Sequence, residues 1–74
     1  MDYVDLGRRI RKQRSVKGWT QEALAERVNV STSFVGHVER GTRKASLETL
    51  VAMANVLDVS LDYLLSGSMN NSVI

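Results

Sequence analysis

The chain has 74 residues, a net charge of +2 and no cysteine, and its composition changes only over the last few positions, so we expect one domain stabilised by packing and helix capping. The lack of cysteine excludes disulfides and thiolate metal sites, and a single histidine leaves no ligand set for a metal ion. No apolar run approaches the roughly 18 residues of a membrane span, and the N-terminus lacks the apolar stretch of a signal peptide, so we expect a soluble, cytoplasmic protein that binds no membrane.

The first predicted element is a helix over about residues 2–17, closed by Gly18. Arg14 follows Leu6 and Ile10 at intervals of four, on the stripe that otherwise faces the core, where a charge needs a partner. The helix holds six of the ten basic residues: Arg8, Arg9, Arg11, Lys12, Arg14 and Lys17. A second basic cluster consists of Arg40, Arg43 and Lys44. This distribution indicates an anionic partner such as nucleic acid, although a solvated basic face is a common alternative.

Four hydroxyl residues mark the starts of the remaining helices. Each stands directly before a run with helical periodicity, where a side-chain oxygen can accept a hydrogen bond from a free backbone N–H. These predicted N-caps are Thr20, Ser31, Ser46 and Ser60. With the first helix they give five short helices, and no segment has the alternation of a strand. The predicted fold class is therefore all-α.

The helix over residues 31–40 differs from the others at its start. The other three capped helices have an acid two residues after the cap, which complements the positive end of the helix dipole, whereas this one has Ser33. A start without negative charge suits approach to phosphates or base edges. An exposed helix start that merely lacks an acid is an equally good interpretation of this feature alone.

The two sides of this helix have different chemistry. At about 100° per residue, the inner side is apolar and consists of Phe34, Val35 and Val38. The outer side is polar and consists of Ser33, Gly36, His37 and Arg40, with Thr32 at its edge. Gly36 costs about 1 kcal/mol relative to alanine inside a helix. Its presence suggests either drift or something that approaches the backbone closely there, as a DNA groove would.

A tight corner precedes this helix. Asn29 stands where the chain needs left-handed geometry, which asparagine tolerates better than most residues, and small Ala25 lets the two neighbouring helices cross at close range. Two helices that meet at a sharp angle across a turn of three or four residues form a helix-turn-helix, whose second helix enters the major groove of DNA.

The segment "TQEALAERVNVSTSFVGHVERG", followed by "SLETLVAMANVLDVSLDYLL", resembles the Cro and lambda-repressor (XRE) type of DNA-binding domain over about residues 5–65. The departures are modest: Asn29 stands where the family usually has glycine, Ala45 where it often has proline, and Gly36 is unusual in the recognition helix. The resemblance implies a compact five-helix domain over residues 1–66, with helices 2 and 3 forming the helix-turn-helix. It implies a sequence-specific regulator of transcription, expected to be a repressor, that binds double-stranded DNA as a dimer on a palindromic operator. Residues 67–74 have the composition of a flexible tail.

The resemblance also assigns roles to single residues. Side chains of the third helix that match base-reading positions are Thr32, Ser33 and His37. Residues that match DNA-backbone contacts are Thr20, Gln21, Arg40, Thr42, Arg43 and Lys44. Each of these also has a plainer interpretation as a helix former, a cap-region residue or a loop charge. The resemblance further implies that Arg14 and Glu39 pair across the helices, which we interpret as an architectural ion pair, and from charge we expect Arg8 and Arg9 to add phosphate contacts.

Enzymatic activity and protein interaction are the two alternatives to DNA binding. Ser33 and His37 lie four residues apart, where a hydroxyl and an imidazole can meet, but no orienting acid lies on that face and no oxyanion loop is evident, so we predict that the protein is not an enzyme. The main alternative is a protein-interaction module with the same fold, which would present an apolar outer side on the helix over residues 31–40. No cofactor or small-molecule ligand is indicated.

The last predicted helix carries more apolar surface than one face can bury in so small a core. The residues concerned are Leu61, Tyr63, Leu64 and Leu65. We expect a symmetric homodimer that forms through these side chains.

Overall fold

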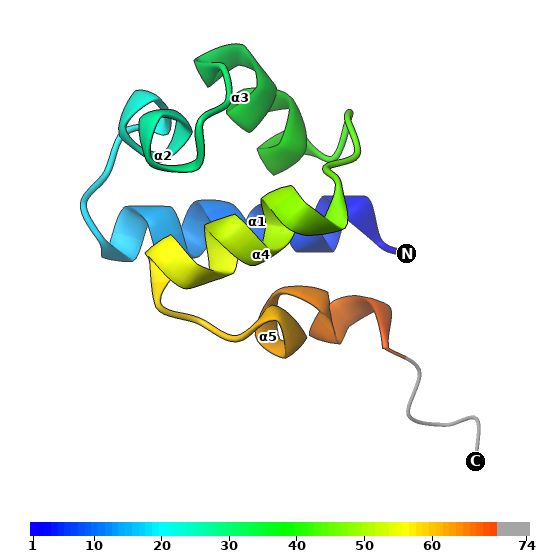
Figure 1. Ribbon diagram of the computed structural model, residues 1–74. Coiled ribbons are helices and arrows are strands. Elements are labelled where there is room, and N and C mark those ends of the chain that lie inside the picture. The colour runs from blue at the N-terminus through cyan, green and yellow to red at the C-terminus, as the bar shows by residue number, and fades with distance from the viewer. Residues whose placement is uncertain (70–74) are drawn as a thin grey trace.

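The computed structural model describes residues 1–69, which form five α-helices, one short 3-10 helix and no strand (Figure 1). The helices are α1 Tyr3–Val16, α2 Gln21–Val28, α3 Thr32–Arg40, α4 Leu47–Leu57 and α5 Leu61–Leu65, and the 3-10 helix η1 spans Ser66–Ser68. The predicted all-α class and the five helices are confirmed. No single helix in this range is long and apolar enough to cross a membrane; α4 together with the segment Leu61–Ser68 meets that requirement only as a pair bent by 117°.

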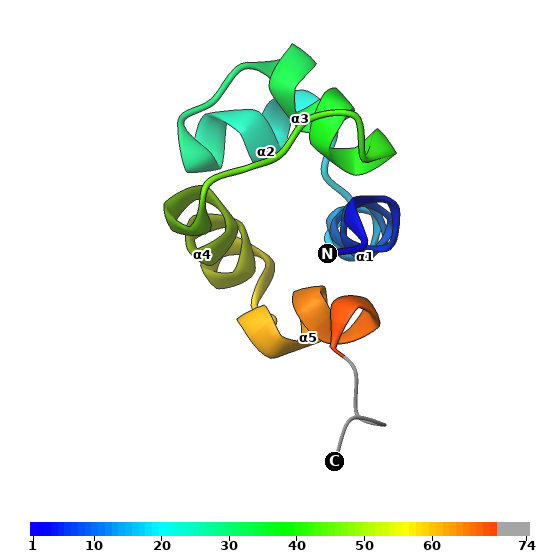
Figure 2. The ribbon, with the colours of Figure 1, turned by 90° about the vertical axis from the view of Figure 1, so that its right-hand side faces the viewer.

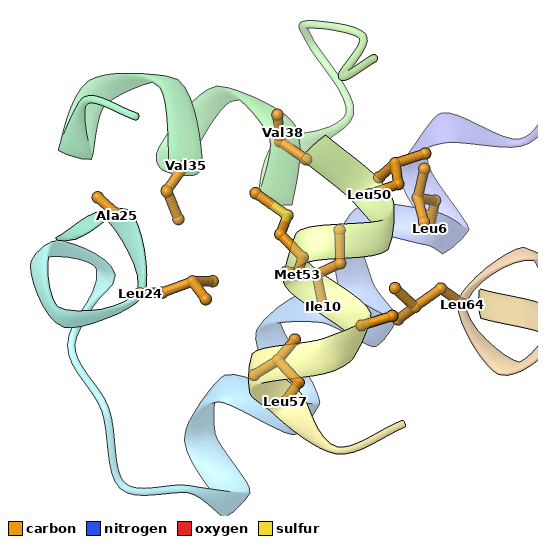
Figure 3. Packing of buried hydrophobic residues seen from close by; sticks show 11 residues of the cluster. Leu6, Ile10, Leu24, Ala25, Val35, Val38, Leu50, Met53, Leu57 and Leu64 are labelled. Atoms are coloured by element: carbon orange, nitrogen blue, oxygen red, sulfur yellow. The ribbon is translucent and has the colours of Figure 1, made fainter. Parts of the chain in front are cut away.

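The five helices surround a single apolar core. Figure 2 shows α2 and α3 at one end of the molecule, α5 at the other, and α1 and α4 on opposite sides between them. Burying one large apolar side chain contributes about 1.5–3 kcal/mol relative to leaving it exposed, so this core is the main source of stability. Its members come from all five α-helices (Figure 3): Leu6, Ile10, Leu24, Ala25, Val35, Val38, Leu50, Met53, Ala54, Leu57 and Leu64.

The four predicted N-caps are confirmed. In each, the side-chain oxygen accepts a hydrogen bond from the backbone N–H three residues further on, at 3.0–3.1 Å. These caps are Thr20, Ser31, Ser46 and Ser60. Asn29 has a φ of 60°, in the left-handed region as predicted, and the N–H of Val30 donates to the Ala25 carbonyl at 3.0 Å. Three residues therefore suffice to end α2 and start α3.

The segment after α5 packs against the start of α1. Asp2 caps α1 by accepting a hydrogen bond from the Asp5 N–H at 2.9 Å, and its own N–H donates to Ser68 Oγ at 2.8 Å. A Cβ at Gly67 would overlap the Asp5 carboxylate, so η1 lies directly on α1. Residues 67 and 68, which composition assigns to the tail, are thus part of η1. Met69 follows η1, and tail positions 70–74 lie outside the described residues.

The prediction that Leu64 forms a dimer contact is wrong. Its side chain is 0% exposed and points into the core, because α5 crosses the end of the core and packs against both α1 and α4 (Figure 3). Leu61, Tyr63 and Leu65 are half-buried and pack against the same core. The exposed large apolar side chains of the described chain lie on other elements: Met1, Val4, Val16, Leu47, Val51 and Met69. The apolar surface of the last helix is therefore smaller than the sequence suggests.

Gly7 lets α1 and α3 approach each other backbone to backbone. A Cβ at this position would lie 2.7 Å from the carbonyl carbon of Glu39 and would overlap the carbonyl oxygens of Val38 and Glu39. Helix backbone cannot move aside as a flexible side chain can. The close approach therefore requires glycine, although glycine weakens a helix interior by about 1 kcal/mol relative to alanine.

We expect Gly7→Ala to lower the free energy of unfolding by about 3 kcal/mol, because the added methyl group forces α1 and α3 apart. Gly36→Ala is the matched control inside α3, since the nearest neighbour of a Cβ there is the flexible end of Arg40, at 3.1 Å. It should be neutral or stabilise the fold by up to about 1 kcal/mol. Chemical denaturation measures both changes, and similar effects at the two glycines would contradict the constraint inferred for Gly7.

Candidate nucleic-acid interface

α3 lies at one end of the molecule, packed against α2 and α1 (Figures 1 and 2). Its inner side is as predicted: Val35 and Val38 belong to the core, and Phe34 is half-buried against it. The first turn contains no acidic residue. The outward polar side chains are Thr32, Ser33 and Arg40, which are exposed, and His37, which is half-buried. α3 thus presents a polar, uncharged start and a basic end to solvent.

Gly36 is not exposed, although the helical pattern places it on the outer side of α3. It is buried beneath the side chains of Gln21 and Arg40. The atoms nearest to a Cβ at this position would be Arg40 Nη1 at 3.1 Å and Gln21 Oε1 at 3.5 Å. The chain's own side chains therefore occupy the space beside this glycine, and an external partner is not needed to explain it.

A buried ion pair holds α3 against α1. Arg14 Nε and Nη2 donate to Glu39 Oε2 and Oε1 at 2.6 and 3.1 Å, and only 2% of the Glu39 side chain is exposed. Arg14 Nη1 also donates to the Trp19 carbonyl at 2.7 Å. The structure thus brings together the two residues that the sequence predicts to pair, and the paired guanidinium also fixes the turn between α1 and α2.

Gln21 is a further partner of Glu39 that sequence reasoning missed. Its Nε2 donates to Glu39 Oε1 at 3.0 Å. Side chains from α1, α2 and α3 therefore meet at one carboxylate, and no buried side-chain nitrogen or oxygen in the described residues lacks a hydrogen-bond partner. A residue assigned only to DNA contact thus also fixes the angle between the two helices of the helix-turn-helix.

The loop after α3 continues the basic surface of its last turn. Arg43 and Lys44 are exposed. The guanidinium carbon of Arg43 lies 5.8 Å from the centre of the Phe34 ring, and Lys44 Nζ lies 5.3 Å from the centre of the Tyr3 ring. Such contacts between cations and aromatic rings restrain the charged groups beside the helix. Together with Arg40 they form a basic edge at the C-terminal end of α3.

Thr42 turns back onto His37. Its N–H donates to the His37 carbonyl at 2.9 Å, and its hydroxyl oxygen lies 3.1 Å from that carbonyl oxygen and 2.9 Å from His37 Nδ1. His37 therefore takes part in closing α3, a role that the sequence did not indicate. The imidazole is bonded to Thr42 rather than to Ser33, so the hydroxyl and imidazole considered for catalysis do not form a pair.

Arg9 is placed differently from the phosphate contact predicted for it. Its Nε donates to Asp5 at 2.7 Å, and its guanidinium lies 5.1 Å from the centre of the Tyr63 ring on α5, whereas α3 is at the other end of the molecule. The hydrogen bond to Asp5 raises the pKa of the Arg9 guanidinium above its ordinary value. Arg8 contacts the same carboxylate at 3.4 Å, but 71% of its side chain is exposed. Arg9 is thus a structural residue.

The candidate site is a surface rather than a cleft. Residues 1–69 contain no detectable pocket and no group of three histidine, cysteine or acidic side chains that could hold a metal ion. What the surface offers is hydroxyl groups, one imidazole and cationic side chains arranged along one helix and the loop that follows it. These groups suit a polyanion that also carries hydrogen-bonding edges.

Residues 8–64 match the family model described as helix-turn-helix. The chain is 45% identical over 58 residues to the uncharacterized HTH-type transcriptional regulator YazB of Bacillus subtilis, an alignment that covers 78% of this chain and 84% of YazB. Three further regulators of B. subtilis are 36–38% identical, and this chain spans 49–57% of their length.

Solved structures of similar proteins share the fold. The restriction-modification controller protein C.AhdI from Aeromonas hydrophila is 41% identical, with a TM-score of 0.81 over 85% of this chain and 96% of C.AhdI. The P22 c2 repressor, solved in complex with a synthetic operator, is 37% identical, with a TM-score of 0.80 over 84% of this chain and 94% of the repressor. SinR, solved in complex with DNA, is 36% identical, with a TM-score of 0.76 over 81% and 97% of the two chains.

We expect Arg14→Leu to lower the free energy of unfolding by about 3 kcal/mol, because it leaves Glu39 as a buried carboxylate whose only remaining side-chain partner is Gln21. Arg11→Leu is the matched control, an exposed arginine on the same helix, and should change stability by no more than about 0.5 kcal/mol. Denaturant unfolding of both variants provides the comparison. Equal costs would show that the ion pair has no special architectural role.

Proposed function

This chain belongs to the XRE-type helix-turn-helix family of transcriptional regulators, and on that premise we propose that it binds double-stranded DNA sequence-specifically through the outward side of α3. The observation that carries the proposal is the polar outward side of α3, with no acid in its first turn and with the buried Arg14–Glu39 pair behind it. A rigid helix with such a surface suits the major groove, where base edges present donors and acceptors. The complexes of the P22 c2 repressor with an operator and of SinR with DNA support this reading.

Thr32, Ser33 and His37 are the residues that we assign to base edges. A hydroxyl group both donates and accepts hydrogen bonds. A neutral imidazole donates from one ring nitrogen and accepts at the other, so all three side chains can match base edges. Thr32 and Ser33 are exposed in the N-terminal turn of α3. That part of a recognition helix is the part that contacts bases in this motif.

The flanking residues are assigned to the phosphates. Arg40, Arg43 and Lys44 supply three cationic groups at the end of α3, where each phosphate contact releases counterions. At the start of α2, the Thr20 oxygen accepts the capping bond and the hydroxyl keeps its own hydrogen for a phosphate. Gln21 uses one hydrogen of its amide for Glu39 and has a second for the DNA.

A two-fold dimer on a palindromic operator is the assembly that we propose. Leu61, Tyr63 and Leu65 on α5 remain candidates for the interface because they are half-buried, whereas Leu64 is committed to the core. A dimer that covers its operator would compete with other proteins for the same DNA, which suits a repressor. Such a protein acts where the DNA is, in keeping with the cytoplasmic location expected from the sequence.

A protein-interaction module fits the surface less well. It would present an apolar outward side on α3, but none of the exposed large apolar side chains of residues 1–69 belongs to that helix. Catalysis fits no better, because the family consists of regulators rather than enzymes and His37 is bonded to Thr42.

DNA bound by this protein should be selected from a random duplex pool, and affinity should fall steeply as salt is raised, with a slope of about −0.9 per phosphate contact in a plot of log affinity against log salt. Arg43→Gln should weaken binding to every sequence alike and reduce the slope by about 1. Lys12→Gln, which removes an exposed charge from α1, is the control and should leave the slope unchanged. Gel shifts over a salt series provide the measurement. Equal affinity for selected and random duplex would overturn the proposal.

The proposed dimer should place its half-sites about one DNA turn apart, roughly 34 Å, and Leu65→Glu should weaken self-association by putting a charge into the interface. Val51→Glu, at an exposed apolar position of α4, is the matched control. Sedimentation analysis gives the oligomeric state of each variant. A monomer at tens of micromolar, both free and bound to DNA, would contradict the dimer, and dissociation by Val51→Glu alone would move the interface to α4.

A further inference from the structure

Two short contacts meet at the hydroxyl oxygen of Thr42. His37 Nδ1 lies 2.9 Å from Thr42 Oγ1, and the His37 carbonyl oxygen lies 3.1 Å from the same atom. Both distances are those of hydrogen bonds, so each contact requires one hydrogen between its two heavy atoms. A threonine hydroxyl carries only one hydrogen, and a carbonyl oxygen carries none.

Counting hydrogens fixes the arrangement. If the hydroxyl donated to Nδ1, its oxygen would face the carbonyl oxygen with no hydrogen between them, and the two would repel. Both contacts are satisfied only when the hydroxyl donates to the carbonyl and Nδ1–H donates to the hydroxyl oxygen. A neutral imidazole then has no hydrogen on Nε2, because only one of its two nitrogens is protonated.

The hydroxyl is not needed to cap the helix. The N–H of Thr42 already donates to the His37 carbonyl at 2.9 Å, and the N–H of Gly41 donates to Val38 at 3.0 Å, so the end of α3 is closed by backbone groups. The Thr42 hydroxyl instead fixes the orientation of the His37 ring and keeps the ring hydrogen on Nδ1. Because the Thr42 hydroxyl donates its hydrogen to the His37 carbonyl, it has none left for the phosphate contact that the resemblance assigns to Thr42.

We propose that Thr42 is a positioning residue that holds His37 in the Nδ1–H form, so that Nε2 acts as a hydrogen-bond acceptor for an exocyclic amino group in the major groove. The proposal rests on the proposed function, because it assumes that His37 faces a base. On the strand that His37 faces, adenine offers its N6 amino group and cytosine its N4 amino group. Guanine offers only acceptors on that edge, and thymine an acceptor and a methyl group. The structure thus assigns adenine or cytosine to the base opposite His37.

The hydrogen on the ring can be measured without DNA. His37 is the only histidine, so the imidazole ¹⁵N spectrum of the free protein contains a single pair of ring signals. At mildly alkaline pH, where imidazole is neutral, we expect the wild-type shifts to show the hydrogen on Nδ1. Thr42→Val keeps the shape but removes the hydroxyl and should give a mixture of both forms, whereas Thr42→Ser should restore the wild-type spectrum. A wild-type ring with its hydrogen on Nε2 would overturn the proposal.

Selection from a random duplex pool tests the base. The position read by His37 is the one whose preference is lost in His37→Ala, and the wild type should favour adenine or cytosine there by about 3- to 10-fold, the range of one hydrogen bond. Thr42→Val should reduce this preference while the other operator positions keep theirs, and Thr42→Ser should retain it. Guanine or thymine at that position, or an unchanged preference in Thr42→Val, would overturn the proposal. If no sequence were enriched, both the proposed function and the assignment of the base would fail. The ¹⁵N spectra would still show which nitrogen of the His37 ring carries the hydrogen.

Discussion

The carboxylate of Glu39, buried among side chains of α1, α2 and α3, fixes the orientation of the candidate interface. A charge in such a place tolerates little displacement, because every lost hydrogen bond leaves it uncompensated at low dielectric. The backbone of the same residue contacts α1 at Gly7, where no side chain intervenes. Backbone contact thus sets the distance between α1 and α3, and the ion pair with Arg14 sets the rotation of α3 about its own axis. The outward direction of the remaining side chains follows from these two restraints.

Apart from the Arg14–Glu39 pair, which the family resemblance implies, the features of the fold that the sequence predicts correctly depend on neighbours within about five positions. The hydroxyl caps, the left-handed Asn29 and the apolar side of α3 are all local in this sense. The roles of Leu64 in the core and of Gly7 at the α1–α3 contact depend instead on how the helices pack against one another. Five residues of α5 do not reveal which side meets the core, and a glycine inside a helix reads from sequence only as a weak helix former.

The same distinction explains the candidate site. The sequence identifies the basic residues of the site, but charge alone does not show at which end of the molecule each one lies. It therefore predicts a phosphate contact for Arg9, whose guanidinium lies against Tyr63 of α5. The bond between Gln21 and Glu39 appears only once the crossing of α2 and α3 is known. The contact of Thr42 with His37, by contrast, has a local signal in the sequence. Gly41 closes α3 in the left-handed conformation, and the residue after such a glycine commonly donates to the carbonyl five positions earlier.

The outward side chains of α3 differ in how strongly they are tied to the rest of the molecule. Thr32 and Ser33 are exposed, and their side chains form no hydrogen bond within the part of the chain that the structure describes, whereas His37 is bonded to Thr42. Descendants of one ancestral gene can therefore exchange Thr32 and Ser33 one at a time without loss of folding, and under the proposed function such exchanges would change the DNA that they bind. A change at His37 requires a matching change at Thr42, because the two side chains are bonded to each other. The outward residues should thus evolve quickly at the start of α3 and slowly near its end.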